Sequence, residues 1–316
     1  MRLGKLTLSA KVLAVIIVLI VAGISLPLIF IDLRTVAIND VMSVGPDGSG
    51  RLDLRVEATV GELEVIFRPL GNEAVMVRSM VEGKANVFGD GSPLKVNVTS
   101  SSAADAMGSV QAVNVTLNTY APWPHYSIRK VNYTITIDEG LRTGLNLSVR
   151  TGGISLATAA GVVIEGLELN STAKGAAVSF ANGTVLAGDV RIQTATGGSN
   201  LSWDNVTVLG ARNIALLESS GPITAMFSQS SPMGGSVRMR VVDAVGEVRL
   251  GFDLAGQASA RITCGWNLGT PEVTDLGGFS GTPENFLSDN YPGGSSFRVQ
   301  VNQTLGNIRV DGRWAA

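Results

Sequence analysis

The sequence contains very little cysteine, histidine and charge. Among its 316 residues there is one Cys and one His. A single Cys excludes an intramolecular disulfide framework and a Cys-based zinc site, and a single His excludes metal centres that need two or three imidazoles. Charged residues make up 16% of the chain, against roughly 25% in an ordinary soluble domain. The formal net charge is −2. The chain therefore lacks the excess of basic residues expected of a nucleic-acid-binding protein.

The motifs of common enzyme classes are also missing. Gly48-Ser49-Gly50 and the other glycine clusters lack the Lys-Ser/Thr of a phosphate-binding loop. Neither a GxSxG elbow nor an HExxH sequence occurs. We therefore expect no catalytic residue, no cofactor, no metal and no nucleic-acid partner, and a role that is not enzymatic.

One long uncharged segment is present, from Val12 to Ile31. As a helix rising 1.5 Å per residue it would span about 30 Å, the thickness of a bilayer core. Three basic residues and no acid precede it: Arg2, Lys5 and Lys11. This bias predicts a single-pass anchor in the cell membrane, with a cytoplasmic N-terminus and residues 35–316 outside. The alternative is a cleaved signal peptide ending near Ala22, and both interpretations export the remaining chain.

After residue 50 the apolar residues alternate with polar ones, as in Leu52-x-Leu54-x-Val56, which is typical of strands. The chain also holds 38 Gly, and a recurring unit accounts for many of them: two alternating apolar residues, a short polar stretch, Gly, then two more apolar residues. Its glycines are 22 to 25 residues apart: Gly153, Gly175, Gly198, Gly221 and Gly246. A second series repeats at 22 residues: Gly166, Gly188 and Gly210. A last copy contains Phe297, Val299 and Val301, then Gly306, Ile308 and Val310.

A period in the low twenties without helical patterning favours an all-β fold in which short strands stack as a β-solenoid. Glycine would mark the corners, where φ is positive or backbones approach closely. The alternative is an antiparallel β-sandwich with evenly spaced hairpins. The predicted organisation is a stub and anchor at 1–34, a linker at 35–50, an N-terminal β region at 51–140, solenoid repeats at 141–252, and a loop-rich insertion with terminal strands at 253–316.

Half of the 18 Asn residues stand in Asn-x-Ser/Thr sequons. This excess predicts a heavily N-glycosylated surface on an exported chain. The alternative is an Asn ladder at a solenoid corner, because Asn146 and Asn170, and likewise Asn182 and Asn205, are one period apart. The nine candidates are Asn97, Asn114, Asn132, Asn146, Asn170, Asn182, Asn200, Asn205 and Asn302.

Four other places in the sequence carry residues that could form a chemical site. His125 lies in an aromatic, proline-bearing loop without an identifiable nucleophile or acid, so we expect it to pack in that loop. Cys264 follows Ile262-Thr263 in an apparent strand and is expected to be a small buried hydrophobe. Glu165 and Glu168 are three residues apart, so in a strand they should face different directions as solvated charges. Asp289-Asn290 could bind Ca²⁺, but the repeated Asp spacing of known calcium loops is absent.

The unit Leu147-Ser-Val149-Arg-Thr-Gly-Gly153-Ile-Ser-Leu156 resembles the adhesin-like and toast-rack group of cell-envelope β-solenoid domains. The C-terminal Phe297-Arg-Val299-Gln-Val301 … Gly306-Asn-Ile308-Arg-Val310 has the same pattern. The resemblance covers 145–252 and 289–312. It implies a surface or envelope role and a single-pass anchor, and it transfers no catalytic residue.

These observations predict a membrane-anchored, exported, N-glycosylated surface protein with a structural or adhesive role. Its expected partners are the lipid bilayer through Val12–Ile31, cell-surface glycans or other envelope proteins, and further copies of itself. Two alternatives stay open: an envelope carbohydrate-active enzyme on a β-helix, and the subunit of a surface filament whose edge strands pair.

Overall fold

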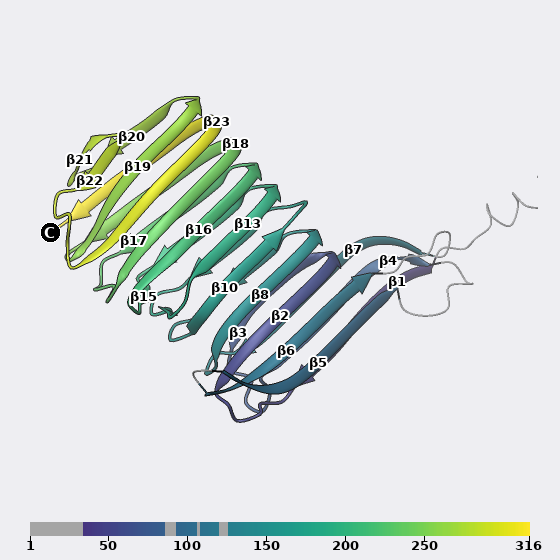
Figure 1. Cartoon of the computed structure of the whole chain (residues 1–316). Coiled ribbons are helices and arrows are strands. Elements are labelled where there is room, and N and C mark those ends of the chain that lie inside the picture. Colours follow the sequence, from purple (N-terminus) through teal and green to yellow (C-terminus); the bar gives the residue numbers. More distant parts are fainter. Residues whose placement is uncertain (1–33, 86–92, 106–107, 120–125) are drawn as a thin grey trace, which may run out of the picture.

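The computed structural model describes residues 34–85, 93–105, 108–119 and 126–316. This part of the chain is all-β, as predicted, and its strands lie side by side along one axis (Figure 1). The strands are β1 (Arg34–Val44), β2 (Arg51–Val60), β3 (Glu62–Arg68), β4 (Val75–Ala85), β5 (Leu94–Asp105), β6 (Gly108–Thr119), β7 (Tyr126–Asp138), β8 (Arg142–Thr151), β9 (Ile154–Ala157), β10 (Val163–Ser171), β11 (Ala176–Phe180), β12 (Val185–Leu186), β13 (Val190–Thr196), β14 (Ser199–Asp204), β15 (Thr207–Val208), β16 (Ala211–Ser220), β17 (Ile223–Gln229), β18 (Ser236–Ala255), β19 (Ala258–Leu268), β20 (Pro271–Asp275), β21 (Phe279–Thr282), β22 (Asn285–Ser288) and β23 (Ser295–Ala315).

The predicted membrane segment Val12–Ile31 lies outside the described residues. Within the four described ranges, no helix has the length and apolar character needed to cross a membrane.

One stack of parallel strands, called here the first wall, runs through β2, β8, β10, β13, β16 and the first part of β18. Residues that face each other in neighbouring strands are 22 to 25 positions apart in the repeats. Leu145 stands opposite Leu167, which stands opposite Val190. Parallel partners need a connection that returns the chain to the same end, and here a second strand makes that return.

The returning strands form a second stack, the second wall, made of β3, β9, β11, β14, β17 and the latter part of β18. Ile154 faces Ala176, which faces Ser199, at the same offsets as in the first wall. Strand β18 belongs to both walls, because it pairs with β16 up to Asp243 and with β17 from Val248 onward. Strand β23 then pairs in parallel along β18 across both walls.

The core lies between the walls. Alternate residues of each strand are buried, which places the Leu, Val and Ile of the repeats inside and their polar neighbours outside. A row of aromatic rings occupies successive positions of the second wall: Phe180, Trp203, Phe227 and Phe252. The rings of Phe227 and Phe252 stack with centroids 4.9 Å apart. The Trp203 Nε1–H donates to Gln229 Oε1 at 2.8 Å, so this buried indole is satisfied.

The predicted glycine series lies at the corner where the first wall turns into the second. A Cβ on Gly175 would lie 2.3 Å from the backbone oxygen of Gly198, and one on Gly246 would lie 2.1 Å from that of Gly221. Any side chain would therefore push neighbouring strands apart. Glycine recurs because the corners of adjacent periods touch backbone to backbone.

The register differs from the predicted unit at both ends of the repeat region. The first unit was assigned Leu147 and Val149, but Leu145 and Leu147 are the partners of Leu167 and Leu169. In the last unit, Met239 and Val241 replace the predicted Val237 and Met239 as partners of Ile214 and Leu216. Each strand continues its alternation beyond the wall contact, so the pattern alone did not identify which pair is aligned. The strand pairs within residues 142–255 are parallel, unlike those of the sandwich alternative.

Antiparallel strands cover the end of the stack that contains β1. At this end β6 pairs in parallel with β2, and β7 pairs in parallel with β3. These two strands therefore extend the walls beyond β2 and β3, although they come later in the sequence. Strand β5 pairs antiparallel with β6, while β4 pairs antiparallel with both β7 and β1.

At the other end, the last strand β23 lies between β18 and β19. The segment 253–296, predicted to be rich in loops, contains β19 to β22 and a hairpin between β21 and β22. Short strands interrupted by Gly and Pro have the composition of a loop.

Candidate functional site

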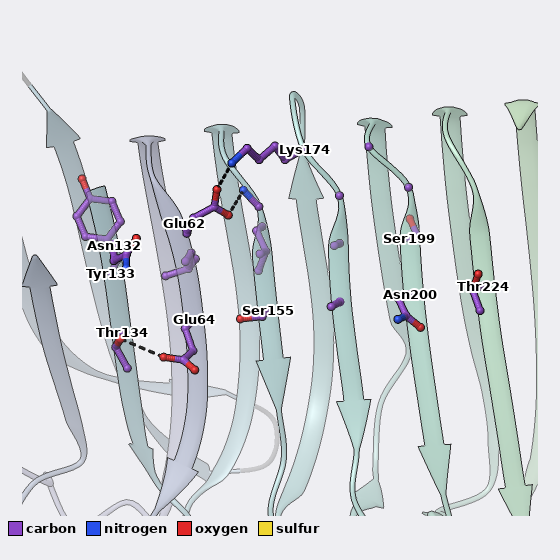
Figure 2. A pocket seen from close by; sticks show the side chains of 18 of the residues that line it. Glu62, Glu64, Asn132, Tyr133, Thr134, Ser155, Lys174, Ser199, Asn200 and Thr224 are labelled. Atoms are coloured by element: carbon purple, nitrogen blue, oxygen red, sulfur yellow. Dashed lines mark hydrogen bonds and ion pairs between the residues drawn. The ribbon is translucent and has the colours of Figure 1, made fainter. Parts of the chain in front are cut away.

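The outer face of the second wall is hollowed into an open groove of about 760 Å³, called here the trough. Strands β7, β3, β9, β11, β14 and β17 cross it side by side (Figure 2). Because one face of each strand is committed to the core, the residues that line the trough are the alternate, outward-facing ones.

Small side chains form the floor of the trough. Ser155, Ala177, Asn200 and Thr224 stand directly opposite one another in four successive strands. The next outward row, which begins with Ala157 and Ser179, continues the hollow by a further groove of about 250 Å³. The floor is low because these residues replace the long side chains that usually cover an exposed sheet.

Charged groups form the rim at the β3 end of the trough. Glu62 makes an ion pair with Lys174, and its second oxygen accepts a hydrogen bond of 2.9 Å from the amide of Gly153. Burial acts to raise the pKa of Glu62, but Lys174 and the Gly153 amide outweigh it, so the pKa lies below its ordinary value of 4.5. On the same strand, Glu64 accepts a hydrogen bond of 3.1 Å from Thr134.

This arrangement suits binding of a polar chain. The floor offers the polar groups of Ser155, Asn200 and Thr224, with Ala177 between the first two, on strands that are about 4.8 Å apart. The rim offers carboxylates and an ammonium. Among the residues that the structure describes, no group of three His, Cys, Asp or Glu could hold a metal ion.

All nine sequon Asn residues fall in the described ranges, and none is buried. Asn97, Asn114, Asn182 and Asn200 are exposed, and the other five are half-buried. Asn132 and Asn200 line the trough. A glycan on Asn200 would occupy the floor, so modification there and ligand binding in the trough exclude each other.

Asn205 differs from the other sequons. Its backbone has a φ of 44°, a left-handed conformation that Asn tolerates better than most residues. Its Oδ1 accepts hydrogen bonds from the backbone amides of Ser230 and Ser231 at 2.7 and 3.0 Å and also from their hydroxyls. Its amide donates to Asp204 at 3.0 Å. This side chain holds a corner together.

The first pair proposed for an Asn ladder is not aligned. The register places Asn146 opposite Glu168, and Asn170 opposite Ser148. One period of separation in sequence therefore does not bring these two amides together.

Glu168 is exposed, as expected, but the expectation was wrong for Glu165 and for the directions in which the two side chains face. A β-bulge between Ile164 and Gly166 changes the alternation, and both carboxylates line the same shallow groove. Glu165 is not solvated: its side chain is 11% exposed and accepts hydrogen bonds from Arg51 and Arg142, each with a shortest distance of 2.8 Å. Burial acts to raise its pKa, but the two guanidinium groups hold it below the usual value.

Of the remaining candidates, Cys264 and Asn290 lie in the described residues. Cys264 is buried, as predicted, and burial raises the pKa of its thiol to about 12. The amide of Asn290 donates to the carbonyls of Gly256 and Ala258 at 3.0 Å, so it closes a loop. His125 lies outside the described residues.

Sequence reasoning did not find the trough. The sequence feature that corresponds to the trough is a small residue at the outward position of consecutive repeats, from Ser155 through Ala177 to Asn200. Small outward residues are common in strands, and only the register shows that these are neighbours.

Comparisons with known proteins give structural likeness without a family. No protein-family model matches the sequence, and no curated protein does. One similar structure is described as a "putative cell adhesion protein" of Clostridium sporogenes; it is 10% identical, has a TM-score of 0.35, and the match covers 88% of this chain and all of that one. A "putative adhesin" of Bacteroides fragilis is 12% identical with a TM-score of 0.27, over 87% of this chain and 97% of that one. A "putative adhesin" of Parabacteroides distasonis is 8% identical with a TM-score of 0.27, over 89% and 98%. At these TM-scores the likeness carries no argument about function.

Proposed function

We propose that this chain is an exported surface protein that binds an extended polar ligand, such as a glycan, in the trough of the second wall. The observation that carries the proposal is the aligned row of small residues across β9, β11, β14 and β17, in which Ser155, Asn200 and Thr224 are polar and Ala177 is not. Hydroxyl and amide groups on three of these four strands suit a ligand that presents hydroxyl groups repeatedly along its length.

We also infer that each 22–25-residue period is one coil of a β-solenoid. The support is the parallel register of both walls and the glycine contacts at the corner between them. Such a stack is stiff, because every coil shares its core with two neighbours. It would display the trough at a fixed place outside the cell.

The anchor and the glycans belong to the proposal through the sequence. Val12–Ile31 would hold the protein in the membrane, and β1 follows it at one end of the stack (Figure 1). The exposed sequons outside the trough, Asn182 among them, would carry sugars on the faces that the ligand does not use.

A role without catalysis is part of the proposal. A glycan-cleaving site needs a carboxylic acid that keeps its proton near neutral pH. The carboxylate at the rim of the trough, Glu62, has the opposite character, because Lys174 and the Gly153 amide lower its pKa. Its place at the rim suits orientation of a ligand.

The test is glycan binding by the full-length protein, kept in solution with mild detergent and applied to an array of polysaccharides. Ala177→Ile fills the floor with a residue that suits strands, and we expect it to weaken binding of the selected glycan at least about tenfold. Ala112→Ile makes the same change on β6, which pairs with β2 of the first wall and lies away from the trough, and it should leave binding intact. The proposal fails if no glycan binds the native protein, or if both variants bind equally well.

A further inference from the structure

The first wall carries a row of like charges near the C-terminal end. Arg238 of β18 stands directly opposite Arg298 of β23, which stands directly opposite Arg261 of β19. Arg240, two residues beyond Arg238, faces the same side. All four side chains are exposed and line an open groove of about 530 Å³. These four residues are called here the arginine ladder.

Three arginines elsewhere in the sheet are neutralised by a carboxylate two residues away on their own strand. Arg55 pairs with Glu57, Arg249 with Glu247, and Arg309 with Asp311. In the described part of the chain, no ion pair or hydrogen bond joins any guanidinium of the arginine ladder to an acid. Among the described residues, Arg191 and Arg150 of the first wall also lack an acidic partner, but neither stands in a row of aligned arginines as the arginine ladder does.

Like charges directly opposite each other in a sheet repel and destabilise it. The ladder therefore acts against folding unless its charge is used. Neighbouring strands are about 4.8 Å apart, so the three aligned guanidinium groups present donors at regular short intervals. Arginine binds carboxylate, sulfate and phosphate through two parallel hydrogen bonds. A ligand with repeated anionic groups would match this row.

We propose that the arginine ladder binds an acidic polysaccharide, one with a carboxylate or sulfate on successive sugars. Tyr291 lies at the groove and offers an aromatic ring against which a sugar can pack. The net charge of the chain is −2, which disfavours a general polyanion such as nucleic acid. The site is on the other wall from the trough, so this inference goes beyond the proposed function and does not require it.

The experiment measures binding of the full-length protein to polygalacturonate, a polyuronate, at low and at physiological salt. Dextran serves as the neutral polysaccharide, a single-stranded DNA as a non-sugar polyanion, and phosphatidylglycerol vesicles as an anionic surface. We expect selective binding of polygalacturonate that weakens as salt rises, since the contacts are ionic.

Arg298→Gln removes the central guanidinium and should reduce binding about tenfold, the loss expected for charge-assisted hydrogen bonds. Arg298→Lys keeps the charge but not the paired donors and should lie in between. Arg249→Gln, on the same strand as Arg238 but on the second wall, is the matched control and should bind like the native protein.

A readout of folding separates a ligand site from a structural role. If the ladder is held in place for a ligand, Arg298→Gln should keep or raise the melting temperature, because it removes repulsion. The proposal is overturned if polygalacturonate does not bind, if Arg298→Gln binds it as well as the native protein, or if that variant loses binding only because it melts earlier. Equal or stronger binding of DNA or of vesicles would also overturn it, in favour of that partner.

Discussion

Two buried carboxyl groups stacked in the core make the stability of this protein depend on pH in an unusual direction. Glu218 of β16 stands opposite Asp243 of β18, which stands opposite Gln303 of β23. Their residues are 4%, 0% and 4% exposed. Glu218 accepts a hydrogen bond of 3.1 Å from Ser199, and Asp243 accepts one of 3.2 Å from Gln303.

The other oxygens of this stack have no partner. Glu218 Oε1, Asp243 Oδ1 and Gln303 Oε1 are buried and unpaired in the described structure. When both acids are ionised, all three atoms are acceptors and none can satisfy another. A proton on either carboxyl group turns one acceptor into a donor. Burial therefore raises the pKa of both acids, and the charge of Asp243 raises that of Glu218 further.

The sign of the pH effect follows from these directions. A folded-state pKa above the unfolded value means that the folded protein binds the proton more tightly. This contribution to stability is fully present below the ordinary pKa of Glu, 4.5, and is lost as the pH rises through the raised value. Leaving a buried acceptor unpaired costs about 1–3 kcal/mol, which sets the size of the loss at alkaline pH.

Glu218→Gln tests this reasoning, because it removes one ionisation and places an amide donor beside Asp243. We expect the variant to be more stable than the native protein by about 1–3 kcal/mol at pH 8 and nearly equal to it at pH 4. Thermal melting followed by circular dichroism, at one heating rate across this pH range, measures the difference. Glu168→Gln, an exposed acid on β10, is the control. A Glu218→Gln variant that is destabilised equally at both pH values would refute the reasoning.

Three further changes test the corners and the core. Gly175→Ala places a Cβ 2.3 Å from the backbone of the next strand and should lower the free energy of unfolding by about 1–3 kcal/mol. The control is Gly166→Ala, whose Cβ meets nothing within 4 Å. Urea denaturation compares the two variants, and equal losses of stability would contradict the corner argument. Asn205→Ala removes the oxygen that accepts hydrogen bonds from Ser230 and Ser231 and should lower the free energy of unfolding by about 1–3 kcal/mol. Asn205→Asp keeps that oxygen and should lose less. Glycopeptide mass spectrometry should find Asn205 unmodified, and a glycan there would contradict its structural role. Gln229→Leu leaves the buried Trp203 indole N–H unpaired and should cost about 1–3 kcal/mol, seen as a lower melting temperature; an unchanged melting temperature would show that the bond contributes little.

The repeats show which structural features an alternating strand pattern can predict and which it cannot. Alternation and the glycine period predicted the all-β fold and the crowded corner at Gly175, because a side chain in a strand must face in or out and a backbone contact excludes a Cβ. The same pattern misaligned the first unit by two residues at Leu147, since every alternate position of a long strand looks equivalent. The bulge at Glu165 could not be predicted from the pattern, because one extra residue reverses the alternation without changing the composition.

The sequence by itself determined which residues are inside, where the corners lie, and the period at which the strands repeat. These are local properties, fixed by apolar alternation and by the absence of a Cβ. Only the tertiary structure decided which outward residues become neighbours: the small floor around Ala177, the buried stack at Glu218, and the arginine ladder. Arg298 meets Arg238 and Arg261 only because β23 lies between β18 and β19. That contact depends on register and strand order across many residues, and no short stretch of sequence contains it.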